Sequence, residues 1–551
     1  MVTSVKIGGQ NAIILREGTS RTQGREAQHA NIEAALVIAE SIKSSLGPKG
    51  MDKMLVDGFG DVTISNDGAT ILDEMDVQHP AAKTMVEVAK TQDDEVGDGT
   101  TTAVILAGEL LIKAEALMDK DVHPTQVIDG YSLAEAKAVE FLHKIAIKVG
   151  PTDKVMLKKI AEVSIASKLI SEQKEYVADI AVKAVLQVAD KSGTGYTVDI
   201  DNVKVEKKPG GSLTDTKLIQ GVLLDKEVVH PGMPKRVESC KIVLLNCPLE
   251  IEKPEFDSKL NIDNPEQMKR FLDEEEKLLR EMVEKIASVG ANVVVCEKGI
   301  DDVVQHFMAK KNILAVRRVK QSDMEKLTKA TGGHIITNIS DLKSSDLGQA
   351  KLTEERKVSD DKMTFIEGCK DPKALSILVR GGTERVVDEA ERAIHDALCV
   401  VRDVVVEPYV VVGGGATESE VARMIRSYGE KLSGKEQLAV QAFADSLETI
   451  PLILAENAGM DPINSLMEIR AKHQGKQRWA GIDPFKGRVT DVSKLDVYEP
   501  LAVKVQAVKS AGEAAGMLLK IDDVIAASKS KEGAGGPKGP KDSAKEEGEG
   551  D

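Results

Sequence analysis

The chain has 551 residues, 42% of them hydrophobic and 30% charged, and a length of this size predicts three or four domains. Its formal net charge of −16 argues against a dedicated nucleic-acid binder, because such proteins gain affinity by neutralising phosphates with Lys and Arg. Five cysteines without CxxC spacing indicate neither a zinc site nor a disulfide framework. The lack of a signal-peptide pattern or an apolar run of about 20 residues predicts a soluble protein of the cytoplasm.

The first predicted helix covers residues 29–46, and Gly47-Pro48 ends it in the usual manner. The loop at 46–50 is rich in glycine and carries a lysine. It is not a P-loop, since GxxxxGK[ST] is absent from the chain, and alone it is an ordinary helix exit. Residues 54–68 then predict a hairpin. Asp67 closes it within an Asn-Asp-Gly turn, so its simplest role is that of a turn residue.

The densest chemistry lies in residues 93–118, after a helix that Pro80 opens. Four carboxylates within six residues precede three threonines and an almost wholly apolar helical run. A helix that is apolar on most sides is usually buried, so its N-terminus would be a fixed point suited to a phosphate. Asp98 could hold a Mg²⁺ that bridges phosphate oxygens. The alternative is a helix cap preceded by a solvated acidic turn.

Gly150-Pro151 indicates a boundary at the end of the helical segments, and from about residue 221 predicted strands alternate with predicted helices. That order predicts an α/β unit set apart from the helical region. The predicted helices are 179–189, 265–287, 301–310 and 322–330, and the predicted strands are 203–205, 241–245, 292–296, 313–316 and 334–337.

An unusual segment at 248–265 carries apolar residues among charges. They are Leu249, Ile251, Phe256, Leu260 and Ile262. No period would bury them together, and exposed apolar residues in a polar context indicate an interaction site. Local packing beneath the loop is the alternative.

The second half of the chain repeats the pattern of strand, glycines and helix. A strand at 374–379 leads to Thr383, a suitable N-cap for the next helix. Asp388 lies on that helix between two arginines, so a solvated ion-pair face is its alternative reading. Three glycines at 413–415 follow a short strand, although the full GxGxxG is missing. A turn at 481–483, a last helix ending near residue 527 and a low-complexity tail complete the chain.

Together, and in this order, these segments resemble the group II chaperonins, the family of the archaeal thermosome and the eukaryotic cytosolic chaperonin. The segments that carry the resemblance are 45–54, 65–70, 97–102, 385–393, 413–416 and 481–483. They keep the family's order across about residues 10–525, and the thermosome type is the nearer match. The sequence departs from the family pattern at Pro484 and Lys486.

The resemblance implies a multidomain fold with three kinds of domain. A mostly α-helical equatorial ATP-binding domain would comprise residues 1–150 and 405–527. A small α+β intermediate hinge domain would comprise 151–216 and 371–404. An α/β apical substrate-binding domain would comprise 217–370, with a helical lid protrusion at about 248–280. Residues 528–551 would be a disordered tail.

The resemblance also implies an ATP-dependent chaperone subunit, a Mg²⁺-dependent ATPase. Its copies or paralogues would form two stacked rings that close around unfolded client proteins, with neither nucleic acid nor membrane as a partner. Asp67 and Asp388 would activate the attacking water, and Asp98 would bind Mg²⁺. The implied nucleotide contacts are Leu46, Gly47, Pro48, Gly99, Thr100, Thr101, Thr102, Lys168, Gly415, Asp483 and Glu499. Because Asp388 would lie on the hinge domain, hydrolysis would be coupled to domain closure.

Two other functions use the same residues. One is a small-molecule phosphohydrolase or kinase, and the other is a non-catalytic scaffold that binds nucleotide to hold its shape. The apolar residues in the middle segment favour the chaperone, since an enzyme acting on a small molecule does not need them.

Overall fold

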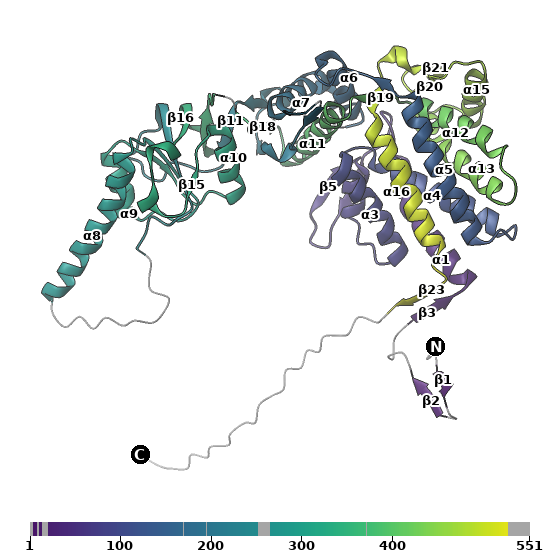
Figure 1. The fold of residues 1–551 in the computed structure, drawn as a ribbon, viewed down its shortest axis with the longest axis horizontal. Helices are drawn as coiled ribbons and strands as arrows, with labels where there is room; N and C mark the ends of the chain where they lie inside the picture. Colours follow the sequence, from purple (N-terminus) through teal and green to yellow (C-terminus); the bar gives the residue numbers. More distant parts are fainter. Residues whose placement is uncertain are drawn as a thin grey trace, which may run out of the picture.

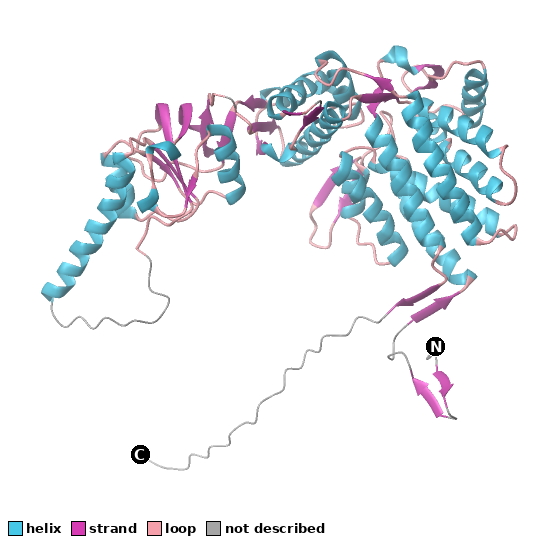
Figure 2. Cartoon of the chain, in the orientation of Figure 1, coloured by secondary structure: helices cyan, strands magenta, loops and turns pink. Residues whose placement is uncertain are grey.

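The computed structural model of the chain describes residues 4–7, 10–13 and 20–526, apart from 169, 194, 252–264 and 371. Figure 1 shows these residues as an elongated row of a helical unit, a middle unit and an α/β unit. Most helices gather in the helical unit, whose strands lie at its borders, whereas the larger sheets lie in the other two units (Figure 2). The multidomain, helix-rich architecture expected from the sequence is confirmed.

The helical unit combines the two ends of the chain around one helix. Its helices are α1 (Arg25–Lys43), α2 (Gly68–Asp73), α3 (Pro80–Val96), α4 (Thr100–Met118), α5 (Pro124–Ile145), α12 (Ala416–Gly429), α13 (Glu436–Leu447), α14 (Thr449–Asn457), α15 (Pro462–Gln474) and α16 (Leu501–Leu519). Helix α4 packs against α1, α3, α13 and α16, and its first twelve residues are buried. Its apolar sequence therefore predicted its central place correctly.

Short strands border the helical unit. They form the hairpins β4 (Lys53–Val56) with β5 (Val62–Ser65) and β20 (Ala480–Asp483) with β21 (Arg488–Asp491), and β1 (Ser4–Ile7) pairs with β2 (Gln10–Ile13). A three-stranded sheet of β22 (Tyr498–Pro500), β19 (Tyr409–Val412) and β6 (Ile147–Lys148) lies beside the middle unit. The predicted turn at 481–483 is wrong, because these residues belong to β20 and the turn follows at 484–487.

The predicted extent of the last helix is also wrong. Helix α16 ends at Leu519, and β23 (Asp523–Ala526) instead pairs antiparallel with β3 (Ser20–Gln23). The backbone of these residues finds its hydrogen-bond partners near the other end of the chain, which a local pattern cannot reveal. Arg21 and Asp523 form an ion pair of 2.5 Å across the two strands. The tail at 528–551 lies outside the described residues.

One apolar stretch of the helical unit, 436–457, is long enough to cross a membrane, and sequence reasoning overlooked it. In the structure it is divided into α13 and α14, and 72% of its apolar window is buried among other helices. Glu448 interrupts it and pairs with Arg426 and Arg470. It packs as part of the core.

The middle unit joins segments from both sides of the α/β unit. Its helices are α6 (Lys154–Ile165), α7 (Lys174–Val188) and α11 (Glu384–Val406). Its strands are β9 (Val203–Pro209), β18 (Leu375–Gly381) and β10 (Lys217–Ile219) in one sheet and the hairpin of β7 (Asp190–Ser192) and β8 (Gly195–Thr197). Thr383 caps α11 by accepting a hydrogen bond from the Val386 N–H, as predicted. Helix α6 was not predicted.

The α/β unit is built on a seven-stranded sheet. The sheet runs in the order β11 (Gly221–Leu224), β17 (Asp361–Glu367), β16 (Gly348–Val358), β12 (Arg236–Leu245), β13 (Val293–Cys296) and β14 (Leu314–Val316), with β15 (Ile335–Ile336) also paired to β12. Its helices are α8 (Pro265–Ser288), α9 (Asp302–Lys310) and α10 (Gln321–Thr331). The predicted alternation of strands and helices is confirmed. The β16–β17 pair was missed because its many charged side chains hid the alternation of a half-buried strand.

The apolar segment before α8 is only partly described. Leu249 is fully buried and forms a parallel bridge with Ile300, so for this residue the alternative of local packing is confirmed. Ile251 is exposed, and Phe256, Leu260 and Ile262 lie outside the described residues. Helix α8 also exposes Met268, Phe271, Leu272 and Leu278.

The packing of α5 on α16 predicts a pH-dependent stability. Burial and the nearby Glu513 raise the pKa of Glu135 to about 7, against the opposing effect of Lys509. Between about pH 4.5 and 7 the folded state therefore holds a proton that the unfolded state has lost, and stability falls as the pH rises. We expect Glu135→Gln, which stays neutral, to be more stable than the wild type by about 1 kcal/mol at pH 8 and nearly equal to it at pH 4.5.

Denaturant titrations at both pH values measure this difference. Glu135→Asp is the matched control, because it keeps the carboxyl group and should show no stabilisation at pH 8. Equal stabilities of Glu135→Gln and the wild type at pH 8 would show that Glu135 ionises freely.

Candidate functional site

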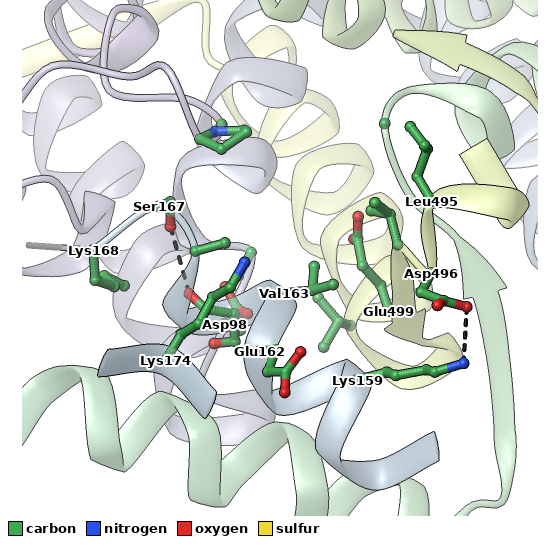
Figure 3. Close-up of a pocket in the computed structure, with 18 of the residues that line it drawn as sticks. Asp98, Lys159, Glu162, Val163, Ser167, Lys168, Lys174, Leu495, Asp496 and Glu499 are labelled. Atoms are coloured by element: carbon green, nitrogen blue, oxygen red, sulfur yellow. Dashed lines mark hydrogen bonds and ion pairs between the residues drawn. The ribbon is translucent and has the colours of Figure 1, made fainter. Parts of the chain in front are cut away.

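A cavity of about 860 Å³ opens where the helical and middle units meet (Figure 3). Of the residues predicted from the sequence, those that line it are Leu46, Gly47, Pro48, Asp67, Asp98, Gly99, Thr100, Thr101, Thr102, Lys168, Gly415, Asp483 and Glu499. Asp388 does not line it. An ion pair of 2.8 Å between Lys159 of α6 and Asp496 also links the two units across the cavity.

One end of the cavity is the N-terminus of α4. The turn before the helix needs glycine, since Gly97 and Gly99 adopt φ values of 66° and 77° on either side of Asp98. No side chain caps the helix, so no side-chain acceptor occupies its first N–H groups. These groups form the positive end of the helix dipole. The Asp98 carboxylate accepts a hydrogen bond of 2.6 Å from the Gly99 N–H. This end is suited to an anion accompanied by a cation.

Asp67 lies beside that helix terminus, where it caps α2. One carboxylate oxygen accepts hydrogen bonds from the N–H and hydroxyl of Thr70, and the other accepts one of 2.9 Å from the Thr100 hydroxyl. Burial opposes ionisation, but the Lys168 ammonium, 3.7 Å away, and these hydrogen bonds outweigh it and lower the pKa of Asp67. Asp67 is therefore a carboxylate at neutral pH, held with both oxygens oriented.

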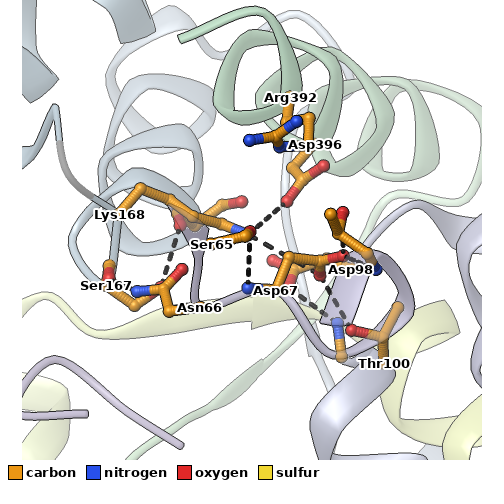
Figure 4. Close-up of polar contacts among 12 residues, drawn as sticks. Ser65, Asn66, Asp67, Asp98, Thr100, Ser167, Lys168, Arg392 and Asp396 are labelled. Carbon is orange, nitrogen blue, oxygen red and sulfur yellow. Dashed lines mark hydrogen bonds and ion pairs between the residues drawn. The ribbon is translucent and has the colours of Figure 1, made fainter. Parts of the chain in front are cut away.

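Lys168 joins Asp67 to a second carboxylate that the sequence analysis did not name. Its ammonium lies 2.9 Å from Asp396 of α11, and both side chains are less than a tenth exposed (Figure 4). Burial would lower the pKa of Lys168, but Asp396, Asp67 and Asp98 outweigh it and raise that pKa. Burial raises the pKa of Asp396 well above its usual value, and the lysine opposes that rise. We call Asp67, Lys168 and Asp396 the interunit charge cluster, because Asp396 belongs to the middle unit.

The structure does not bring Asp388 to the cavity. Its carboxylate pairs with Lys207 at 2.7 Å, and neither of the two arginines considered from the sequence is its partner. Asp396 lies about two helical turns further along α11, on its buried face, and it does reach the cluster. A carboxylate among core positions is costly unless it is paired. A carboxylate at a core position of a predicted helix therefore indicates a buried partner, and this is how the sequence could have indicated Asp396.

The other end of the cavity is formed by the loops before α12 and α16. Gly415 begins α12 with a φ of 77° and without a side-chain cap, and a Cβ atom there would lie 2.6 Å from Pro451. One oxygen of the buried Asp483 accepts hydrogen bonds from the N–H groups of the next turn, and its Oδ2 accepts none. Glu499 pairs with Lys504 at 2.5 Å, and burial raises its pKa. This end offers several acceptors to hydroxyl groups.

The carboxylates of the cavity fit a metal ion that arrives with a ligand. Among the described residues, no group of three or more His, Cys, Asp or Glu side chains could hold a metal by itself. Mg²⁺ bound with a nucleotide needs only one or two carboxylates, because phosphate oxygens and water complete its shell. Asp98, next to the free N-terminus of α4, meets that need.

Comparison with known proteins gives one family. Residues 38–529 match the model of the TCP-1/cpn60 chaperonin family. Thermosome subunit beta of Thermococcus kodakarensis is 58% identical over 97% of this chain and 98% of its own length. A thermosome subunit of Methanopyrus kandleri is 58% identical over 94% and 95%, and thermosome subunit beta of Sulfolobus acidocaldarius is 54% identical over 98% of each chain.

The interunit charge cluster predicts a strong and pH-dependent effect of removing its cation. Lys168→Met leaves two buried carboxylates without their counter-ion, which should cost about 3–5 kcal/mol of stability at pH 8. The loss should be smaller at pH 5, because Asp396, with its raised pKa, then takes a proton. Adding Asp396→Asn should restore part of the stability at pH 8.

Chemical denaturation at the two pH values tests the cluster. Lys207→Met is the control, since it removes an exposed ion pair of α11 and should cost less than about 1 kcal/mol. If Lys168→Met and Lys207→Met cost the same at pH 8, the buried charges do not depend on Lys168.

Proposed function

Since this chain belongs to the TCP-1/cpn60 chaperonin family, as a group II chaperonin subunit of the thermosome type, we propose that its cavity binds ATP with Mg²⁺ and that the interunit charge cluster links hydrolysis to movement of the middle unit. The chain is a subunit of an ATP-dependent chaperone that hydrolyses ATP, and such subunits assemble into rings. One observation supports the mechanism most strongly. A free helix N-terminus, Asp98 and Asp67 meet in a single cavity, and Lys168, which also lines it, joins Asp67 to Asp396 of the middle unit.

The phosphates belong at the α4 end of the cavity. The N–H groups of Thr100, Thr101 and Thr102 and the loop at Gly47 and Pro48 would surround them. Asp98 would hold Mg²⁺, which when bound neutralises charge that develops on the phosphate oxygens. Phosphoryl transfer to water asks a protein mainly for positioning and electrostatic stabilisation, and a rigid buried helix supplies both.

The attacking water belongs between Asp67 and Asp396. The hydroxyls of Thr70 and Thr100 fix Asp67 in its ionised form, so it can accept a hydrogen bond from the water. Asp396 can accept the proton, because burial makes its carboxylate more basic than usual. We assign to Asp396 the role that the sequence gave to Asp388. Because Asp396 lies on α11, any shift of the middle unit moves it relative to Asp67.

The nucleoside belongs at the opposite end. Gly415 lets the start of α12 approach the ligand closely, and Asp483 and Glu499 offer carboxylate oxygens to the ribose hydroxyls. Leu46, Ile482 and Phe485 add apolar surface to the cavity wall for the base. The cavity volume of about 860 Å³ suits a nucleotide more than a bare phosphate.

The three units correspond in this proposal to three domains. The helical unit is the equatorial domain (1–150 and 405–527), the middle unit is the intermediate domain (151–216 and 371–404), and the α/β unit is the apical domain (217–370). Unfolded clients would bind the apical domain, where α8 and Ile251 expose apolar side chains. The same helix would form part of a lid protrusion at about 248–280. Two stacked rings of copies or paralogues would close around the client in the cytoplasm.

Hydrolysis should depend on Asp396 far more than on Asp388. Asp396→Ala should slow single-turnover ATP hydrolysis by about 10²–10⁴-fold, the range for a positioned acid or base, with ATP affinity little changed. Asp388→Ala removes only a partly exposed ion pair and should retain a near-normal rate. Nucleotide binding and single-turnover hydrolysis are measured on the same assembled preparations. The reverse order of the two variants would return the role to Asp388.

The metal assignment predicts the behaviour of Asp98→Ala. This variant should lose Mg²⁺-dependent ATP hydrolysis to the same extent as chelation does in the wild type, since it lacks the carboxylate of the turn that precedes α4. Asp94→Ala is the control, because Asp94 is an exposed neighbour in the acidic stretch that does not line the cavity. Electron microscopy should show intact rings for both variants. Full Mg²⁺-dependent turnover by Asp98→Ala rings would refute the assignment.

A further inference from the structure

A buried glutamine lies behind the turn that carries Asp98. Helix α3 buries six apolar residues and one polar residue, Gln92, which is fully inaccessible to solvent. The apolar residues are Ala81, Ala82, Met85, Val88, Ala89 and Val96. Leu or Met at position 92 would suit this packing without any polar group to satisfy. The presence of an amide here therefore needs a reason beyond packing.

The amide nitrogen of Gln92 has two acceptors from different parts of the chain. It donates hydrogen bonds of 2.9 Å to the Asp98 carbonyl and 3.2 Å to the Val503 carbonyl. Because both acceptors are carbonyl oxygens, the nitrogen must be the atom that faces them. The Gln92 oxygen is buried and has no hydrogen-bond partner, which costs desolvation free energy. The two hydrogen bonds that the nitrogen donates are therefore what the amide contributes.

These contacts hold the Asp98 turn against α3 and α16. The turn bends at Gly97 and Gly99, both at positive φ, and glycine backbones are the most easily deformed. Gln92 holds its central carbonyl from behind. Val503 belongs to the first turn of α16, four residues after Glu499, so one amide connects the Asp98 turn with the start of that helix. A Cβ atom on Gly99 would lie 2.8 Å from Val503 and 3.2 Å from Gln92, which shows how closely both surround the turn.

We propose that Gln92 is a positioning residue for the metal, which acts by fixing the backbone of Asp98 so that its carboxylate faces the cavity. The proposal rests on the proposed function, because it takes Asp98 as the ligand of the nucleotide-bound metal. Groups that orient a metal ligand from behind commonly change metal affinity 10–100-fold when they are removed. Packing by itself gives no reason for metal affinity to change.

Gln92→Met tests the proposal, since Met matches the length and flexibility of Gln and lacks the donors. Mn²⁺ replaces Mg²⁺ as the probe, and electron paramagnetic resonance measures its binding to assembled protein in the presence of ADP. We expect Mn²⁺ to bind about 10-fold more weakly than to the wild type. ADP affinity without metal, measured in EDTA, should change less than about twofold, because the phosphate and ribose contacts remain.

Two further variants separate positioning from packing. Val88→Ala, one turn earlier on the same buried face, loosens α3 without touching Asp98 and should leave Mn²⁺ affinity unchanged. Gln92→Leu should weaken Mn²⁺ binding as Gln92→Met does, and it serves if the Met variant does not fold. Wild-type Mn²⁺ affinity in the Gln92 variants, or an equal loss in Val88→Ala, would overturn the proposal.

Asp98→Ala shows whether any failure lies with the proposed function instead. If the wild type binds no Mn²⁺ with ADP, or if Asp98→Ala binds it equally well, the metal site itself is wrong. If Asp98→Ala loses Mn²⁺ while both Gln92 variants keep it, the metal site stands and the role of Gln92 is refuted.

Discussion

A lysine ammonium that is buried between carboxylates of two units constrains the whole arrangement. Lys168 cannot remain charged inside the protein without partners, and its partners are Asp67 from the helical unit and Asp396 from the middle unit. The two units must therefore approach each other in one specific relation. Asp67 and Lys168 lie at the wall of the cavity, so a charged ligand bound there would change the electrostatic balance that holds the units together.

The buried helix α4 gives the cavity a rigid wall, against which the middle unit can move. Helix α4 is buried on all sides along its first three turns, and it presents the Asp98 turn and three threonines at a fixed place. The middle unit, by contrast, reaches the cavity through α6, α7 and Lys168 and through ion pairs such as that between Lys159 and Asp496. Ion pairs at a partly exposed boundary reform at low cost. In the proposed function, ligand binding would thus shift the middle unit, and through it the α/β unit, while the proposed phosphate site keeps its geometry.

Much of the site could be predicted from the sequence, because short glycine- and threonine-rich segments dictate their own local backbone. The burial of α4 and the cavity position of Asp98 are examples, while the cavity position of Asp67 was implied only by the family resemblance. Features that depend on distant partners could not be predicted. Asp396 was missed because its lysine lies more than 200 residues earlier, whereas Asp388 was taken from the family resemblance although its charged neighbours indicated a surface ion pair. Strand β23 was read as helix because its partner β3 lies at the other end of the chain.

The most direct test of the account is the structure of the assembled protein with Mg²⁺, ADP and aluminium fluoride, which imitates the phosphoryl group in transfer. The account predicts a metal–oxygen distance of about 2.0–2.1 Å to Asp98. It also predicts an in-line water that is hydrogen-bonded to Asp67 and to Asp396, with Asp388 outside the cavity. A structure in which Asp396 stays against Lys168 away from the water, while Asp388 or no residue of α11 contacts it, would contradict the account.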